Sequence, residues 1–345
     1  MAEIIIKPLL YGVDFDSQTR ELTFKRKDGA AIYSCTIPSQ TLVDDVTKPL
    51  MFRAVEDNSS VTLNAVGNYA GTFKTSTDAH TWESYVMGTA ISMNADDRVY
   101  FMVDNFVTKS ASAHCQFVMT GTIEAWHNVN SMISSDFASL ADLSSFGDYT
   151  LADLFRDCSV LVKAPLLPAT TLVLRCYSHM FDGCTGLTQA PALPATTLAN
   201  RCCQYMFQGC TSLTQAPALP ATTLYDYCYQ FMFAGCTSLV QAPVLSATTL
   251  ANSCCQNMFS GCTGLTESPV LNATSLGASY AYSGMFRGCS NLCKVTDHSS
   301  GGVFNTTDNW LYGVAATGEF YCPSNAKWTV TGASGIPDGW TRHDL

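Results

Sequence analysis

Apolar and polar residues alternate in short runs over roughly the first 125 residues of the chain. Alternation places every second side chain on one face of a strand, and turn residues, with Asp28-Gly29 the clearest case, separate the runs. About eight short strands at this spacing predict a small all-β, sandwich-like domain over residues 1–125. The expected strands lie near residues 13–16, 21–25, 31–35, 60–66, 85–92, 99–103 and 116–123.

The pattern changes to a tandem repeat after about residue 150. A Met-Phe pair recurs every 26 residues, once more after a step of 27, and in degenerate form at Leu154-Phe155. Each pair is followed by a Cys and a Leu, and most units then have an Ala/Ser-Pro step and a block close to Leu-Pro-Ala-Thr-Thr-Leu. One unit cannot bury its own apolar face, so stacked units are expected to share a continuous core. The intact pairs begin at Met180, Met206, Met232, Met258 and Met285.

Each repeat is predicted to contain one short strand and one short helix. The segment 187–194 is extended and interrupted by Pro, which cannot donate to a strand ladder. Leu198, Cys202 and Met206 lie four residues apart, a spacing that suits one or two helical turns, and Gly209 is expected to end them. A strand and a short helix every roughly 20–29 residues predict a leucine-rich-repeat solenoid.

The expected fold class is therefore α+β overall, with three regions. The all-β sandwich-like domain covers residues 1–125, and the solenoid with its N-terminal capping turns covers residues 126–295. A C-terminal cap over residues 296–345, which contains Trp310, Trp328 and Trp340, is expected to cover the far end of the stack.

The repeat motif resembles a known family. Met-Phe-x-Gly-Cys-Thr-x-Leu followed by Ala-Pro-x-Leu-Pro-Ala-Thr-Thr-Leu is similar to the BspA-like leucine-rich repeat proteins of gut anaerobic bacteria, from about residue 150 to 295. Residues 313–318 and 335–340 also resemble the closing segment of such proteins. The resemblance implies a surface or secreted adhesin that binds host proteins or other cells. The repeat is longer than the family's short version, so either Ala192 or Leu193 is expected to point inward together with Ala190.

Composition and charge narrow the range of partners. Charged residues make up only 13% of the chain and the net charge is −10, whereas nucleic-acid binding needs clustered Lys and Arg. The short basic run Lys25-Arg26-Lys27 borders a predicted hairpin turn and is expected to be solvated. No apolar stretch of about 20 residues exists, so no membrane span is expected. The first residues do not resemble a secretory signal, so a signal removed earlier and another export route both stay open.

Ten of the sixteen cysteines lie in repeat register. Six follow the Met-Phe pairs and four precede them, which predicts two buried columns of reduced, structural thiols. Neighbouring rungs lie about 4.8 Å apart, so distance does not exclude disulfides, but equivalent positions select no pairs. Metal binding is not expected, because the chain has no Cys-x-x-Cys or His-x-x-x-His pair. Of the two vicinal Cys pairs, only the first members, Cys202 and Cys254, are expected to face the core.

No catalytic constellation stands out, and the chain is expected to be neither an enzyme nor a cofactor protein. The one His within the repeats, His179, occupies a position that holds Tyr, Phe or Asn in the next three units. Exchange among unrelated residues indicates an exposed position without a demanding chemical role, whereas a nucleophilic site needs a fixed orienting His. The paired Thr columns, the Gln column from Gln189 and the Asp78 turn, which resembles a shortened Asp-box, are interpreted as structural.

Positions at which the repeats disagree are the candidates for a binding surface. Fixed positions are expected to hold the core, and Tyr and Arg at variable positions are typical of binding hot spots. The expected function is a non-catalytic interaction module, a monomeric cell-surface or secreted adhesin for a protein or glycan on another cell. Two alternatives stay open: a virion-associated receptor binder of a phage tail or injection apparatus, and a carbohydrate-binding accessory module. The candidate partner-binding residues are Arg175, Tyr177, His179, Arg201, Tyr205, Tyr225, Tyr227, Tyr229 and Phe231.

Overall fold

The structure, a computed structural model, describes residues 12–16, 21–25, 31–36, 42–301, 305–328 and 330–345, which form two units, 1–44 and 45–345. The first unit holds a three-stranded antiparallel sheet in the order β1-β2-β3. The predicted strands near 13–16, 21–25 and 31–35 are thereby confirmed, whereas the Asp28-Gly29 turn and the basic residues Arg26-Lys27 lie outside the described residues. The strands are β1 (Gly12–Asp16), β2 (Glu21–Lys25) and β3 (Ala31–Thr36).

The second unit begins with two sheets that face each other across an aromatic cluster. One sheet has the order β12-β11-β4-β9-β6-β7 and the other the order β10-β5-β8. Phe52, Phe101 and Phe117 pack edge to face between the sheets with ring centroids 4.7–5.7 Å apart. This arrangement is compatible with the predicted sandwich. The strands are β4 (Met51–Ala54), β5 (Ser59–Val66), β6 (Thr72–Ser76), β7 (Glu83–Tyr85), β8 (Ile91–Met93), β9 (Arg98–Asn105), β10 (His114–Thr120), β11 (Ile123–Trp126) and β12 (Leu161–Lys163).

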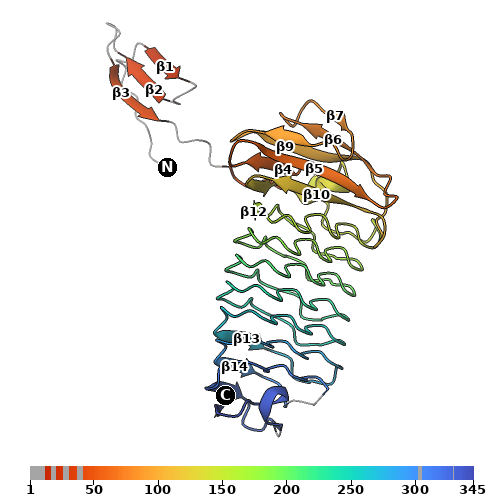
Figure 1. Ribbon diagram of the computed structural model, residues 1–345, viewed down its shortest axis with the longest axis vertical. Helices are drawn as coiled ribbons and strands as arrows, with labels where there is room; N and C mark the ends of the chain where they lie inside the picture. Colours follow the sequence, from red (N-terminus) through yellow and green to blue (C-terminus); the bar gives the residue numbers. More distant parts are fainter. Residues whose placement is uncertain (1–11, 17–20, 26–30, 37–41, 302–304, 329) are drawn as a thin grey trace. The chain divides into compact units, whose positions relative to one another are not determined.

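The repeats continue directly from these sheets as a stack of coils, one coil for each repeat (Figure 1). The last strand of the sandwich, β11, pairs in parallel with β12 of the first coil. The Phe155 ring stacks on Phe117 at 5.4 Å, so the sandwich and the stack share one hydrophobic core. Between them lie two short 3-10 helices, η1 (Val129–Met132) and η2 (Phe137–Ser139).

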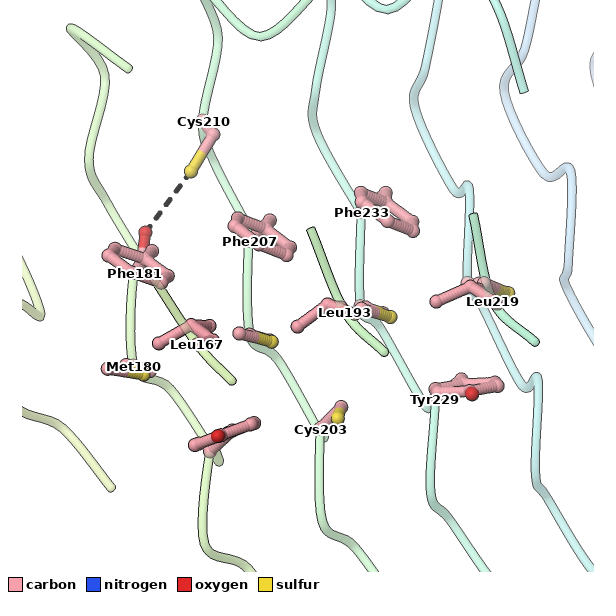
Figure 2. Packing of buried hydrophobic residues seen from close by; sticks show 14 of the residues in the cluster. Leu167, Met180, Phe181, Leu193, Cys203, Phe207, Cys210, Leu219, Tyr229 and Phe233 are labelled. Carbon is pink, nitrogen blue, oxygen red and sulfur yellow. Dashed lines mark hydrogen bonds between the residues drawn. The ribbon is translucent and has the colours of Figure 1, made fainter. Parts of the chain in front are cut away.

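Isolated parallel bridges and stacked side chains join successive coils. Thr171 bridges to Thr197, and Gln189 bridges to Gln215 in the next coil. The Phe ring of each Met-Phe pair stacks almost parallel to the next ring, with centroids 5.3–5.6 Å apart. Phe181, Phe207 and Phe233 show this arrangement in Figure 2. The open question of register is settled by burial, because Leu193 is buried whereas Ala192 is exposed.

The predicted short helix of each repeat is wrong, because the backbone there is a run of tight turns. In an α-helix every N–H would bond to the carbonyl four residues earlier. Here Ser178 N–H donates to the Arg175 carbonyl three residues earlier, whereas the next N–H along the chain, of His179, donates to Gln204 in the next coil. Local and inter-coil bonds alternate in this way along the segment.

Left-handed residues four positions apart explain why the sequence resembled a helix. Arg175, His179 and Gly183 have φ of 56°, 55° and 76°, and the coils that follow repeat this pattern. Side chains therefore return to the same face every four residues, close to the helical period of 3.6. The predicted α+β fold class and leucine-rich-repeat solenoid are thus wrong: the described residues are mainly β structure and turns, with three 3-10 helices of three or four residues. The expected strand over 187–194 is likewise absent from the described coil, which contributes only isolated bridges there.

A parallel four-stranded sheet and three tryptophans form the C-terminal end of the stack. The sheet has the order β13-β14-β15-β16. Trp310 stacks on Trp328 at 5.2 Å and lies 6.4 Å from Phe286, the last ring of the Phe column, while Trp340 Nε1 donates to the Ala315 carbonyl. Within the described residues, no helix is long and apolar enough to cross a membrane. The elements are β13 (Glu267–Leu271), β14 (Lys294–Asp297), β15 (Gly318–Cys322), η3 (Gly332–Ser334) and β16 (Trp340–Asp344).

Candidate functional site

The cysteines of the stack are built into its core. Of the fifteen cysteines whose side chains the structure describes, all are free thiols and only Cys293 is exposed. In the column that follows the Met-Phe pairs, each Sγ donates to a Phe carbonyl of the preceding coil at 3.0–3.1 Å, as Cys210 does to Phe181 (Figure 2). Burial raises the pKa of Cys158 and of Cys289 to about 12. Thiolates are the reactive and metal-binding form, so these thiols are inert at neutral pH.

The predicted column of Cys176, Cys202, Cys228 and Cys254 is also buried, and the column beside it alternates tyrosine and cysteine. Tyr177, Cys203, Tyr229, Cys255 and Tyr282 occupy equivalent positions in five successive coils, and each is at most 2% exposed. Two predictions fail here. Tyr177 and Tyr229 lie in the core and cannot contact a partner, and both members of each vicinal Cys pair are buried, since a backbone of turns does not alternate sides as a strand does.

The other seven candidate residues lie on the outside of the turn segments. Six of them, all with positive φ, form two adjacent columns four residues apart along the chain. In one column the rings of His179, Tyr205 and Phe231 stack with centroids 4.5 and 4.9 Å apart. We call these columns, with the exposed Tyr225 beside them, the aromatic-cationic face. Its members are Tyr149, Arg175, Arg201 and Tyr227 in the first column, His179, Tyr205 and Phe231 in the second, and Tyr225.

Tyr149 belongs to this face although the sequence analysis missed it. It lies 26 residues before Arg175 in the degenerate first unit and has the same left-handed backbone, with φ of 60°. The Arg175 guanidinium lies over its ring at 5.2 Å, and the Arg201 guanidinium lies over Tyr227 at 4.1 Å. Extending the period back through the first unit would have found Tyr149.

The backbone of this face is unfavourable for the side chains that it carries. A positive φ is uncommon outside glycine, with Asn and Asp the usual exceptions, and costs about 1–2 kcal/mol for other residues. A third left-handed column in the same segment holds glycine, as at Gly183 and Gly209. From Tyr149 to Phe231 the first two columns instead carry Arg, His, Tyr and Phe, with Asp153 the one exception. Bulky residues held in left-handed conformations occur often at binding sites.

The charged residues of this face differ in whether an acidic side chain lies beside them. His179 Nδ1 lies 2.9 Å from Asp182 Oδ2, and Arg156 lies 3.3 Å from Asp153 and 3.6 Å from Asp182. By contrast, the described residues include no carboxylate within 4.0 Å of Arg175 or Arg201. His179 therefore has an acidic partner in its own chain, whereas the described residues place none beside the two arginines.

The remaining candidates of the sequence analysis are structural or solvated. The Thr columns and Gln189, Gln215 and Gln241 lie mostly exposed along backbone bridges. A buried amide ladder was missed: Gln204 Nε2 donates to Gln230, and Gln230 Nε2 donates to Gln256. The Asp78 carboxylate accepts four hydrogen bonds within its own turn, and these bonds lower its pKa.

No group of three or more His, Cys, Asp or Glu among the described residues is placed to hold a metal ion. Comparison with known proteins found no matching family model, no matching curated protein and no matching solved structure. The assignment of a function therefore depends on the residues and geometry of the aromatic-cationic face.

Proposed function

We propose that this protein is a non-catalytic binding protein that presents its aromatic-cationic face to a protein or glycan on another cell. The observation that carries the proposal is the concentration of Arg, His, Tyr and Phe on the left-handed columns of one face. Tyr and Arg dominate binding hot spots because they combine a large contact area with hydrogen-bonding groups. The resemblance of the repeat motif to BspA-like surface proteins points in the same direction.

The coil that follows Phe231 indicates that the stack folds without the aromatic rings of the aromatic-cationic face. In that coil the two columns hold Ser253 and Asn257, with φ of 52° and 53°, and its Phe259 still stacks on Phe233 at 5.6 Å. The same backbone and core thus form with small polar residues at these two positions. The rings of the preceding coils are then available for a role other than holding the stack together.

The test is a binding screen of the full chain against immobilised host glycoproteins and glycans. The double variant Tyr205→Gly with Phe231→Gly removes two stacked rings and places glycine on left-handed backbone, which glycine favours. It is expected to weaken any binding found by at least about tenfold, the loss of one or two hot-spot residues. Asn257→Gly, in the same column one coil further, is the matched control and is expected to bind as the parent does.

Two results contradict the proposal. If the double variant binds as tightly as the parent while Asn257→Gly also has no effect, the partner docks elsewhere. If the parent binds nothing in the screen, the adhesin function itself loses its support, and a receptor on a bacterial surface, as for a virion-associated protein, becomes the next target to screen.

A further inference from the structure

Two arginines at the centre of the aromatic-cationic face lack acidic partners. Three other described arginines pair with carboxylates, as Arg53 does with Glu124 at 2.9 Å and Arg156 with Asp153 at 3.3 Å, whereas Arg98 and Arg287 have no carboxylate within 4.0 Å among the described residues. Arg175 and Arg201 have no such partner among the described residues, although the chain carries ten more acidic than basic side chains. Asp226, in the next coil, instead accepts a hydrogen bond from the Asn252 backbone N–H.

The two guanidinium groups stack on tyrosines that lie on opposite sides of the arginine pair. Arg175 and Arg201 occupy the same position in successive coils, so their backbones are about one rung, or roughly 5 Å, apart. Arg175 lies over Tyr149 in the coil before it, whereas Arg201 lies over Tyr227 in the coil after it. Stacking on a ring restricts each guanidinium, so less conformational entropy is lost when it binds a ligand. The pair therefore presents two restrained guanidinium groups from neighbouring coils.

We propose that Arg175 and Arg201 form an anion-binding subsite that takes a carboxylate of an acidic side chain on a protein partner. This inference rests on the proposed function and names the chemistry of its partner. Guanidinium groups bind carboxylates through paired, charge-assisted hydrogen bonds, and two arginines supply donors for both oxygens.

Two observations favour a protein carboxylate over a charged polysaccharide. The Tyr205 ring is covered by His179 on one face and by Phe231 on the other, so it offers mainly its edge and its hydroxyl group, whereas a sugar packs on an open ring face. The net charge of −10 repels a polyanion at long range, while a single carboxylate can still reach two local cations. An acidic residue flanked by other side chains fits both the arginines and the ring edges.

The test measures binding of the full chain, at low and at physiological salt, to an immobilised copolymer in which single glutamates are separated by tyrosines and other uncharged residues. The parent is expected to bind, and more weakly as salt rises, because the attraction of exposed charges is screened. The double variant Arg175→Gln with Arg201→Gln is expected to lose at least about tenfold in affinity. Arg287→Gln is the matched control, because Arg287 also lies over a tyrosine, Tyr312, but has no second arginine beside it.

Unchanged binding of the double variant overturns the inference. The inference is also overturned if sialylated or sulfated oligosaccharides bind in an Arg175- and Arg201-dependent manner and the copolymer does not. Circular dichroism and the melting temperature check the fold, and Arg175→Ser with Arg201→Ser, which introduces the residue of the equivalent Ser253, is the second variant if the first does not fold. If Tyr205→Gly with Phe231→Gly abolishes binding in the screen but the arginine variant does not, the proposed function stands and this inference fails.

Discussion

Phe207 and Tyr205 lie two residues apart on the same coil, and each is stacked between two rings. Phe207 is fully buried, 5.4 Å from Phe181 and 5.5 Å from Phe233. Tyr205 is half-buried, 4.5 Å from His179 and 4.9 Å from Phe231, with φ of 59°. The pair separates the contribution of burial to stability from the contribution of stacking alone.

We expect Phe207→Ala to lower the free energy of unfolding by about 3–5 kcal/mol, because it leaves a cavity in a packed column. Tyr205→Gly loses two ring contacts worth about 0.5–1.5 kcal/mol each, but it relieves a left-handed conformation that costs about 1–2 kcal/mol. The net effect of Tyr205→Gly is therefore expected to lie between a stabilisation of about 1 kcal/mol and a destabilisation of about 2 kcal/mol. The two variants should therefore differ by roughly 3 kcal/mol.

Urea unfolding followed by far-ultraviolet circular dichroism measures both variants, with Asn257→Gly as the control for glycine in the same column. The expected order of midpoints places Phe207→Ala well below the parent and Tyr205→Gly close to it. If Tyr205→Gly destabilises the protein as much as Phe207→Ala, the outer rings hold the coils together. The aromatic-cationic face would then be needed for the stability of the stack, and its rings would not be available to bind a partner.

Three further predictions concern the core. Titration of unfolded, unreduced protein is expected to find most cysteines free and the native protein to react fastest at Cys293, whereas six or more disulfides would contradict the reduced core. Leu213→Asp buries an unpaired charge between coils and is expected to unfold the stack, while Thr214→Asp, at an exposed neighbour, should melt close to the parent. Burial raises the pKa of Asp297 to about 6, so its carboxylate is charged and costly only above that pH. The contribution of Asp297 to the free energy of unfolding is therefore expected to rise by up to about 3 kcal/mol as pH falls from about 7 to about 4. It is measured as a larger hydrogen-exchange protection factor in β14, relative to the intrinsic exchange rate at each pH, and Asp297→Asn should remove it.

The 26-residue period and the strands could be predicted from the sequence, because both are visible in the order of apolar and polar residues. Alternation marks a half-buried strand, so β5 and β9 lie close to the runs 60–66 and 99–103. The turn segments could not be predicted, because left-handed residues every four positions produce an apolar spacing almost equal to that of a helix. The informative signal was the fixed glycine of the third column, at Gly183 and Gly209, which was interpreted only as the end of a helix.

The candidate face could be predicted only in part. The sequence places Tyr177 and Tyr229 with the aromatic residues of the variable positions only if variation between repeats is equated with exposure, although the equivalent position in the coil between them holds the buried Cys203. Variation at a buried position is compatible with a packed core when the neighbouring coils compensate in volume. The unpaired state of Arg175 and Arg201 depends on which carboxylates lie nearby in space, and the sequence alone does not contain this information.

The alternation of tyrosine and cysteine in the buried column makes two coils, not one, the unit by which this protein can change length. Deleting residues 200–225 would remove one coil and set Tyr177 against Tyr229, overpacking a column that now separates its tyrosines by a thiol. Deleting residues 200–251 would remove two coils and set Tyr177 against Cys255, as it now lies against Cys203. Gene duplications and losses that preserve the core are therefore expected in steps of 52 residues. The aromatic-cationic face would then lengthen or shorten by two coils at a time.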